Sequence, residues 1–279
     1  MLLNASEVKA MVVVSFYSYK GGTGRTTLLA NVAALLAREG HDVACVDLDV
    51  NAPGLDVVFS LKDEDCPPRS LLDYFSGAKV SIEEMSVLYR HPELRDRLYI
   101  FPIPRVPTLG TRRPLAPIIR GMTDHLETFV KRVQERLGVE FILLDARSGF
   151  TSESVVHFTL ADEIFVVTRY SYQHIIGTAH ILEVIKQVQV GRIKRPLEYF
   201  VVINDVPYNL PKNIEEELMR FKEEYAAVLI RENRKLRWKD RIVVFDEVFD
   251  SEESREQHEE LMRGYMEVIR YLKGADGDG

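Results

Sequence analysis

Cysteine and tryptophan are scarce in this chain, and the scarcity of cysteine limits what the chain can bind. Two cysteines, Cys45 and Cys66, and one tryptophan occur among its 279 residues. Two cysteines exclude a disulfide framework, and they are too few for a four-cysteine zinc or iron–sulfur site within one chain. Cys45 lies in an apolar stretch typical of a core, which leaves Cys66 as the candidate for a pair shared across a dimer axis.

Long apolar runs and an excess of positive charge are also missing. No run approaches the length of about 18 apolar residues that indicates a membrane-spanning helix, and residues 1–11 lack the basic start and apolar core of a signal peptide. The net charge of −7 argues against a protein that coats nucleic acid with its whole surface. We therefore expect a cytoplasmic protein.

Apolar, β-branched runs alternate with helical patterns along the chain. The predicted strands are 11–17, 42–48, 98–103, 141–145, 163–168, 199–204 and 242–245. The predicted helices are 26–38, 118–137, 173–188, 213–231 and 252–272. This alternation predicts a single α/β domain over 1–279, with a mostly parallel twisted sheet of about seven or eight strands and helices on both faces. Residues 60–117 are the least regular part, and we interpret them as an elaboration of that domain.

A glycine-rich loop follows the first predicted strand, and its sequence is Tyr17-Ser18-Tyr19-Lys20-Gly21-Gly22-Thr23-Gly24-Arg25-Thr26-Thr27. Its glycines permit backbone conformations and close approaches that a side chain would forbid. The amide groups at the start of the next helix attract phosphate oxygens, and the Thr26 hydroxyl suits Mg²⁺. The usual phosphate loop is G-x-x-x-x-G-K-[ST]. Here Tyr19 stands at the first glycine, Arg25 stands at the lysine, and a lysine occurs earlier, as Lys20.

Polar residues also end three other predicted strands. Asp47 and Asp49 project to the same side of one strand end, so they suit water activation and a metal shell, or else they are solvated turn residues. Asp145 follows four apolar residues and suits Mg²⁺ or its waters, with a helix N-cap as the alternative. Asn204 offers a donor and an acceptor to a purine edge, or it forms a turn. The joint order of these groups predicts a nucleotide site.

The chain resembles the ParA/MinD family of deviant Walker-A P-loop ATPases. The resemblance is carried by Lys20 to Thr27, by Asp47-Leu48-Asp49, by the strand ending at Asp145, and by residues 161–168 and 201–204. It extends over nearly the whole chain and is poorest at 60–117. It implies a P-loop NTPase domain that binds ATP and Mg²⁺, holds ADP after hydrolysis, and forms a nucleotide-dependent homodimer with two ATP molecules between the subunits.

The resemblance also implies roles for individual residues. Lys20 reaches across to the phosphates of the partner subunit, and Asp49 activates water, so these two are the expected catalytic residues. Metal binding is expected from Thr26, Asp49 and Asp145. Thr27 is expected at an α-phosphate oxygen, Asn204 at adenine, and Phe245 and Asp246 beside the base and ribose. The complete expected nucleotide-binding set is Lys20, Gly21, Gly22, Thr23, Gly24, Arg25, Thr26, Thr27, Asn204, Phe245 and Asp246.

Arg25 departs from the family's loop, K-G-G-x-G-K-[ST]-[ST]. Arginine keeps a full charge and forks to two oxygens, but it is bulkier and planar, whereas lysine is a compact point charge. We therefore expect a Mg²⁺-dependent ATPase with low turnover. Arg147, two residues after Asp145, is a second departure, and it suits an extra phosphate contact and a surface cap equally.

These patterns lead to a hypothesis for the function and to two alternatives. The hypothesis is an ATP-controlled dimer switch that positions or partitions a cargo such as DNA, a protein complex or a polar assembly. The first alternative is a nucleotide-binding scaffold that hardly hydrolyses ATP, and a phosphate-transferring metabolic enzyme is the less favoured second.

The same patterns favour two further kinds of partner and argue against a third. A protein activator of hydrolysis is one candidate. The basic stretch Arg231–Arg241 suits nonspecific DNA binding or a solvated helix end. The predicted helix 252–272 has an apolar stripe but no basic face, so we expect it to pack on the sheet rather than to bind a membrane.

Overall fold

The computed structural model describes residues 11–103, 115–190, 197–232, 242–246 and 251–273. One eight-stranded sheet runs through it in the order β3-β4-β2-β5-β1-β6-β7-β8. Every neighbouring pair is parallel except β3 with β4. The strands are β1 (Val12–Tyr17), β2 (Val43–Asp47), β3 (Val87–Leu88), β4 (Leu98–Phe101), β5 (Phe141–Asp145), β6 (Glu163–Arg169), β7 (Glu198–Val206) and β8 (Val228–Arg231).

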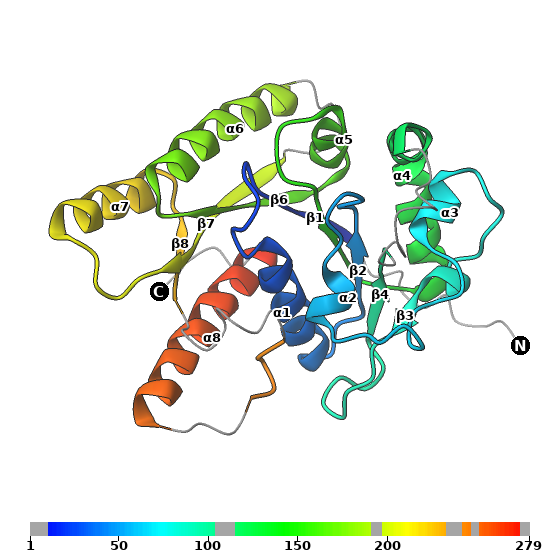
Figure 1. Ribbon diagram of the computed structural model, residues 1–279, viewed down its shortest axis with the longest axis horizontal. Helices are drawn as coiled ribbons and strands as arrows, with labels where there is room; N and C mark the ends of the chain where they lie inside the picture. Colours follow the sequence, from blue (N-terminus) through cyan, green and yellow to red (C-terminus); the bar gives the residue numbers. More distant parts are fainter. Residues whose placement is uncertain (1–10, 104–114, 191–196, 233–241, 247–250, 274–279) are drawn as a thin grey trace, which may run out of the picture.

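Helices cover both faces of this sheet (Figure 1), as the sequence predicts. α1 and α8 pack on one face, and α4, α5, α6 and α7 pack on the other. The bounds are α1 (Arg25–Arg38), α2 (Leu55–Val58), α3 (Leu71–Phe75), α4 (Leu115–Leu137), α5 (Ser152–Leu160), α6 (Tyr172–Val190), α7 (Lys212–Glu224) and α8 (Glu252–Leu272).

Strand β1 shows why both faces are covered. Successive residues of a strand point to opposite faces, and a strand buried on both faces is apolar throughout. Val14 and Phe16 join the core beneath α1 and α8, whereas Val13 and Tyr17 join the cores on the other face. β1 therefore holds the loop that follows it at the centre of the carboxyl edge of the sheet.

The segment predicted as a helix over 213–231 is the first correction. α7 ends at Glu224, and the left-handed backbone of Ala226 (φ 46°) turns the chain into β8, which pairs with β7. No glycine or proline marks this break in the sequence, so the predicted helix was extended through the residues of the short strand.

The segment predicted as a strand over 242–245 is the second correction. It pairs with no strand among the described residues, and the Val243 amide instead donates to Asn31 Oδ1 of α1 at 2.8 Å. Ile242, Val243 and Val244 are buried against the helix layer. An apolar β-branched run needs burial, and here a helix rather than a sheet supplies it.

The irregular part of the chain is built around close helix packing. Between residues 60 and 103 lie α3, a 3₁₀ turn (Glu83–Met85), β3 and β4. A Cβ added to Gly121 of α4 would lie 1.8 Å from the Phe75 carbonyl oxygen, so α3 and α4 are in backbone contact there. Residues 104–114 of the predicted elaboration lie outside the described residues.

The apolar stripe of α8 lies in the core, as expected. Leu261, Val268 and Leu272 are buried in the cluster that α8 shares with α1 and the sheet. Among the described helices, none combines the length and apolarity that a bilayer span requires.

Candidate functional site

The loop after β1 is a cradle of unused amide groups. Gly22 (φ 76°) and Gly24 (φ 80°) have left-handed backbone that other residues adopt only with strain. α1 starts at Arg25 without a side-chain cap, and the amides of residues 22–27 donate no hydrogen bond to any residue that the structure describes. The buried Thr23 hydroxyl also lacks a partner in this part of the chain. Free amides at a helix start favour an anion, and the left-handed glycines expose them.

A cavity of about 340 Å³ opens beside this cradle. It is lined by Ser18 and residues 21–27 of the loop, by Asp49, Ala52, Gly54, Val57 and Val58, and by Ser148. Small-molecule sites usually occupy about 300–1,000 Å³. Sequence reasoning did not single out Val57, Val58 or Ser148, because nothing in the local sequence distinguishes them from other loop residues.

Arg25 makes contacts with the ends of three strands. Its Nε donates to Asp145 Oδ1 at 2.6 Å, its Nη1 donates to Ser18 Oγ at 3.2 Å, and its Nη2 lies 3.5 Å from Asp49 Oδ2. The side chain is only 7% exposed. Burial disfavours the Arg25 charge, but Asp145, Asp49 and Asp47 outweigh that cost and raise the pKa of Arg25 above its ordinary value.

Asp47 and Asp49 hold the loop that follows β2. Asp47 is fully buried; its Oδ1 accepts from the Asp49 amide, and its Oδ2 accepts from the amides of Gly54 and Leu55 at the start of α2. Burial and the nearby charge of Asp145 raise the pKa of Asp47 well above its ordinary value. Asp49 Oδ1 accepts from the amides of Asn51 and Ala52. Asp47 is thus bound to backbone, and Asp49 lines the cavity.

Thr26 and Asp145 lie together, as the sequence predicts for a metal pair. Thr26 Oγ1 donates to Asp145 Oδ2 at 2.7 Å, so both oxygens of Asp145 have partners. Asp49 is linked to Asp145 by Arg25, whose guanidinium pairs with both carboxylates. Hydroxyl and carboxylate oxygens are the donors that Mg²⁺ prefers, so the three expected metal residues have the right chemistry and lie in one place.

Asn204 lies against the loop from the β7 side. Its Nδ2 donates to the Thr23 carbonyl at 2.8 Å. The pairing of β7 with β8 is irregular between Ile203 and Val206, where Asp205 has a left-handed backbone (φ 58°) and forms an ion pair with Arg169 at 2.7 Å.

Lys20 lies apart from the cavity. Its Nζ donates to Gln173 Oε1 of α6 at 2.8 Å, and Lys20 is not among the residues that line the cavity. The ring of Tyr19 lies against the backbone of Gly177, where a Cβ would come within 1.9 Å of it. Tyr19 and Lys20 therefore seat the first half of the loop on α6. Gln173 was missed in the sequence because it lies 153 residues away.

The loop after β5 joins the site from the other side. The Gly149 amide (φ 90°) donates to the Ser18 carbonyl at 3.1 Å. The Asn51 amide oxygen, turned toward Arg147, accepts from its Nε and Nη1 at 3.0 Å each. Arg147 therefore ties the loop after β5 to the loop after β2.

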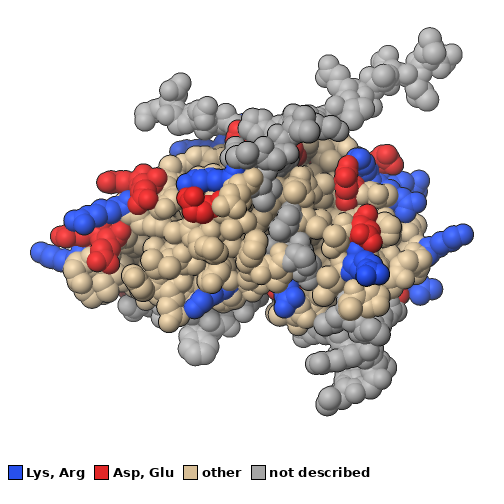
Figure 2. All heavy atoms as spheres, turned by 90° about the horizontal axis from the view of Figure 1, so that it is seen from above, with Lys and Arg blue, Asp and Glu red and all other residues tan. Residues whose placement is uncertain are grey.

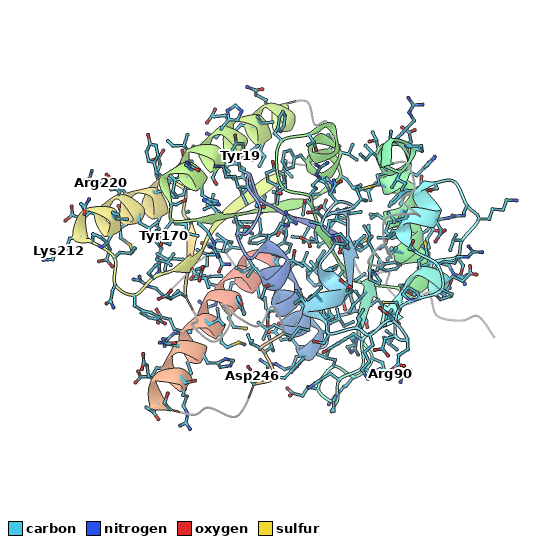
Figure 3. All side chains as sticks on the ribbon, in the orientation of Figure 1. Tyr19, Arg90, Tyr170, Lys212, Arg220 and Asp246 are labelled. Atoms are coloured by element: carbon cyan, nitrogen blue, oxygen red, sulfur yellow. The ribbon has the colours of Figure 1, made fainter. Side chains whose placement is uncertain are left out.

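Phe245 and Asp246 lie elsewhere, which corrects their predicted place beside a base and ribose. The Phe245 ring stacks on His91 with centroids 3.7 Å apart, and the neighbouring Val244 carbonyl accepts from Arg38 at the end of α1. Figure 3 shows Asp246 far from Tyr19 in the loop. The cause is that residues 242–246 pack along α1 and do not form the predicted strand.

The basic stretch Arg231–Arg241 is described only at its start. Arg231 donates to the Pro207 carbonyl at 2.9 Å and lies near Glu215 and Glu260 at 3.6 and 4.0 Å. Its charge is thus engaged within the protein. Residues 233–241 lie outside the described residues.

Comparison with known proteins places these features in a family. Residues 14–265 match the CbiA family, described as the CobQ/CobB/MinD/ParA nucleotide binding domain. An uncharacterised ATP-binding protein of Methanocaldococcus jannaschii is 28% identical over 177 residues, which are 63% of this chain and 60% of that protein. The septum site-determining protein MinD of Thermotoga maritima is 27% identical over 158 residues, 56% of this chain and 51% of that protein. The alignments thus span between about half and three fifths of these relatives.

A solved structure shows the same fold. The septum site-determining protein MinD of Pyrococcus horikoshii, solved as a complex with Mg-ADP, has a TM-score of 0.67 to this chain at 19% identity. The match covers 96% of this chain and 100% of that one.

Proposed function

This chain belongs to the CobQ/CobB/MinD/ParA nucleotide-binding family, and from this premise we propose that it is an ATP-dependent dimer switch that positions a cargo and hydrolyses ATP slowly. The observation that carries the proposal is the cradle of unused amides at residues 22–27, beside the Thr26–Asp145 pair. Two relatives support the nucleotide: one is named as ATP-binding, and the other was solved with Mg-ADP.

The residues divide into phosphate, metal and base groups. The amides of residues 22–27 and the partnerless Thr23 hydroxyl would hold phosphate oxygens. Thr26, Asp145 and Asp49 would hold Mg²⁺, which neutralises the charge that develops on phosphate during transfer. Asn204, already against Thr23, would contact the base edge. Asp49 would orient water, and Phe245 and Asp246 have no part in this assignment.

Low turnover follows from Arg25. Its planar fork is engaged by Asp145, Ser18 and Asp49, whereas a lysine would follow phosphate oxygens flexibly. We expect steady-state ATP hydrolysis by the wild type to be slower than by Arg25→Lys. Equal or faster hydrolysis by the wild type would contradict the proposal that Arg25 lowers the turnover.

The surface beside the loop supports a dimer. Among the described residues, the exposed large hydrophobic side chains are Val57, Phe150, Tyr172 and Ile176. Val57 lines the cavity, Phe150 follows Gly149, and Tyr172 and Ile176 flank the Gln173–Lys20 contact. Figure 2 shows charged side chains gathered toward the two ends of the face that carries α6, with uncharged residues between them. Exposed apolar residues gathered around one site mark an interaction surface. A second copy of the chain docked on this surface would bring its Lys20 to this cavity.

Nucleotide binding, dimerisation and hydrolysis, measured together, decide between the candidates. The chain is incubated with ATP, ADP or no nucleotide and Mg²⁺, and its mass is measured by light scattering. We expect a dimer with ATP only, and its loss in Lys20→Ala and Tyr172→Asp. Gln187→Asp, at another exposed position farther along α6, is the matched control.

The same data separate the alternatives. Dimerisation without hydrolysis favours a nucleotide-binding scaffold. The ion pair of Arg25 with Asp145 is also consistent with that alternative. Hydrolysis without dimerisation favours a metabolic enzyme. No ATP binding at all would refute the proposal.

The cargo is proposed from family likeness. The relatives include septum site-determining proteins, which supports a positioning role. DNA as cargo is tested by ATP-dependent binding that falls steeply with salt. Arg231 contributes little to that case, because its charge already pairs with Glu215 and Glu260.

A further inference from the structure

We propose that Arg25 is a built-in counter-ion that keeps divalent metal ions away from Asp145 and Asp49 until a nucleotide arrives, so that metal binding by this chain requires nucleotide. The inference rests on the proposed nucleotide site and adds to it a rule for the order of binding. It concerns the residue at which the chain departs from the usual phosphate loop.

The guanidinium of Arg25 engages both carboxylates at once. Nε is 2.6 Å from Asp145 Oδ1, and Nη2 is 3.5 Å from Asp49 Oδ2. The third nitrogen, Nη1, donates to Ser18 Oγ. Every nitrogen of the fork therefore has a partner, and each partner stands at the end of a different strand.

A metal ion would need the same oxygens. Mg²⁺ and Mn²⁺ bind carboxylate and hydroxyl oxygens, and the site offers these on Asp145, Asp49 and Thr26. Both oxygens of Asp145 already accept hydrogen bonds, from Arg25 and Thr26. Placing a second cation beside a buried guanidinium costs electrostatic energy that water does not screen, so the metal and Arg25 compete.

The charge of Arg25 cannot be removed by deprotonation. A lysine sheds its proton when burial disfavours its charge, but arginine stays charged in proteins. Metal can bind well only if the guanidinium turns away, and a buried cation turns away only toward another anion. Arg25 lines the cavity beside the free amides of its own loop. A phosphate held by those amides is such an anion, within reach of the same side chain.

The test measures Mn²⁺ binding to the nucleotide-free full-length chain by electron paramagnetic resonance. We expect the wild type to show no stoichiometric binding at millimolar Mn²⁺, and Arg25→Gln to bind Mn²⁺ at least about tenfold more tightly. The gain should vanish in the double variant Arg25→Gln/Asp145→Asn. Arg38→Gln removes a cation from the far end of the same helix and should leave Mn²⁺ binding unchanged.

Three outcomes overturn the inference. They are tight Mn²⁺ binding by the nucleotide-free wild type, an Arg25→Gln affinity equal to that of the wild type, and a gain that survives Asp145→Asn. If Arg25→Gln does not fold, as judged by far-UV circular dichroism, Arg25→Lys replaces it. Lysine reaches one carboxylate at a time, so a smaller gain is expected, and no gain overturns the inference.

The design also separates this inference from the proposed function. ATP added to the wild type should bring Mn²⁺ onto the protein, and by reciprocity Mn²⁺ should raise ATP affinity by the same factor. That factor should shrink in Arg25→Gln. A wild type that binds no ATP refutes the proposed function, whereas the comparison without nucleotide still decides whether Arg25 excludes metal.

Discussion

Replacing Gly177 with alanine tests how the phosphate loop is seated on α6. A Cβ at this position would lie 1.9 Å from Cδ1 and 2.4 Å from Cε1 of Tyr19. Non-bonded carbon atoms approach to about 3.5 Å at the closest comfortable distance. The alanine fits only if the Tyr19 ring moves, and Tyr19 precedes Lys20 in the loop.

The sign of the stability change is the informative part. In an ordinary helix interior, Gly→Ala stabilises by about 1 kcal/mol. Overpacking costs about 1–3 kcal/mol, so Gly177→Ala should destabilise the wild type by up to about 2 kcal/mol once the helix gain is subtracted. In a Tyr19→Ala background the collision is absent, and the same change should stabilise by about 1 kcal/mol. The coupling between the two sites is then the overpacking cost itself, about 1–3 kcal/mol.

The assay is urea unfolding of the four proteins of this double-mutant cycle, followed by far-UV circular dichroism. Midpoints and slopes are both compared, since an unchanged slope licenses reading the midpoint shift as stability. Stabilisation by Gly177→Ala in the wild type would refute the contact between Tyr19 and α6. Equal effects in both backgrounds would do the same.

Three further changes test polar groups that are buried or half-buried. Burial and the nearby Glu198 and Asp162 raise the pKa of Glu163 from 4.5 to about 7, so stability falls as pH rises through that range. Glu163→Gln should therefore stabilise by about 1–2 kcal/mol at pH 8 and have little effect at pH 4. Asp47→Asn keeps one acceptor oxygen but turns a donor NH2 group toward at least one of the three backbone amides that Asp47 now satisfies, and it should destabilise by about 2–3 kcal/mol in thermal unfolding. Asn204→Ala removes the bond to Thr23 and should cost about 1 kcal/mol in urea unfolding.

Exposed residues of the same types supply the controls. Glu183→Gln, Asp63→Asn and Asn213→Ala should each be close to neutral in the same assays. A pH-independent effect of Glu163→Gln, or a neutral Asp47→Asn, would contradict the burial on which these predictions depend. A neutral Asn204→Ala would mean that the Thr23 carbonyl finds another donor.

The strands and helices predicted from the sequence were confirmed where the local sequence fits only one kind of secondary structure. β1 and β5 are apolar except for Ser15 and the terminal Asp145 because both faces are covered, and their runs have no competing interpretation. β8 was missed because its three apolar residues, at the end of a helical pattern, fit a helix and a strand equally well. Residues 242–245 were assigned to a strand because their β-branched run suits one, yet α1 buries them instead.

Whether a site residue was placed correctly from the sequence depended on how far along the chain its structural partners lie. Residues 21–27 are contiguous, so their place in the loop after β1 and the first turn of α1 follows from the local sequence. Asp49 and Asp145 were predicted at strand ends, and parallel neighbours bring such ends to one edge. Phe245 and Asp246 depended on a strand that does not form, and they lie at the other end of α1.

The sequence by itself determined that this chain has a glycine loop between a buried strand and a helix, because that chemistry lies within a few consecutive residues. Only the tertiary structure decided where its two cations point. Lys20 contacts Gln173, 153 residues away, and Arg25 contacts Asp145, 120 residues away. Long flexible side chains take the direction of their partners, and those partners come together only when the sheet assembles.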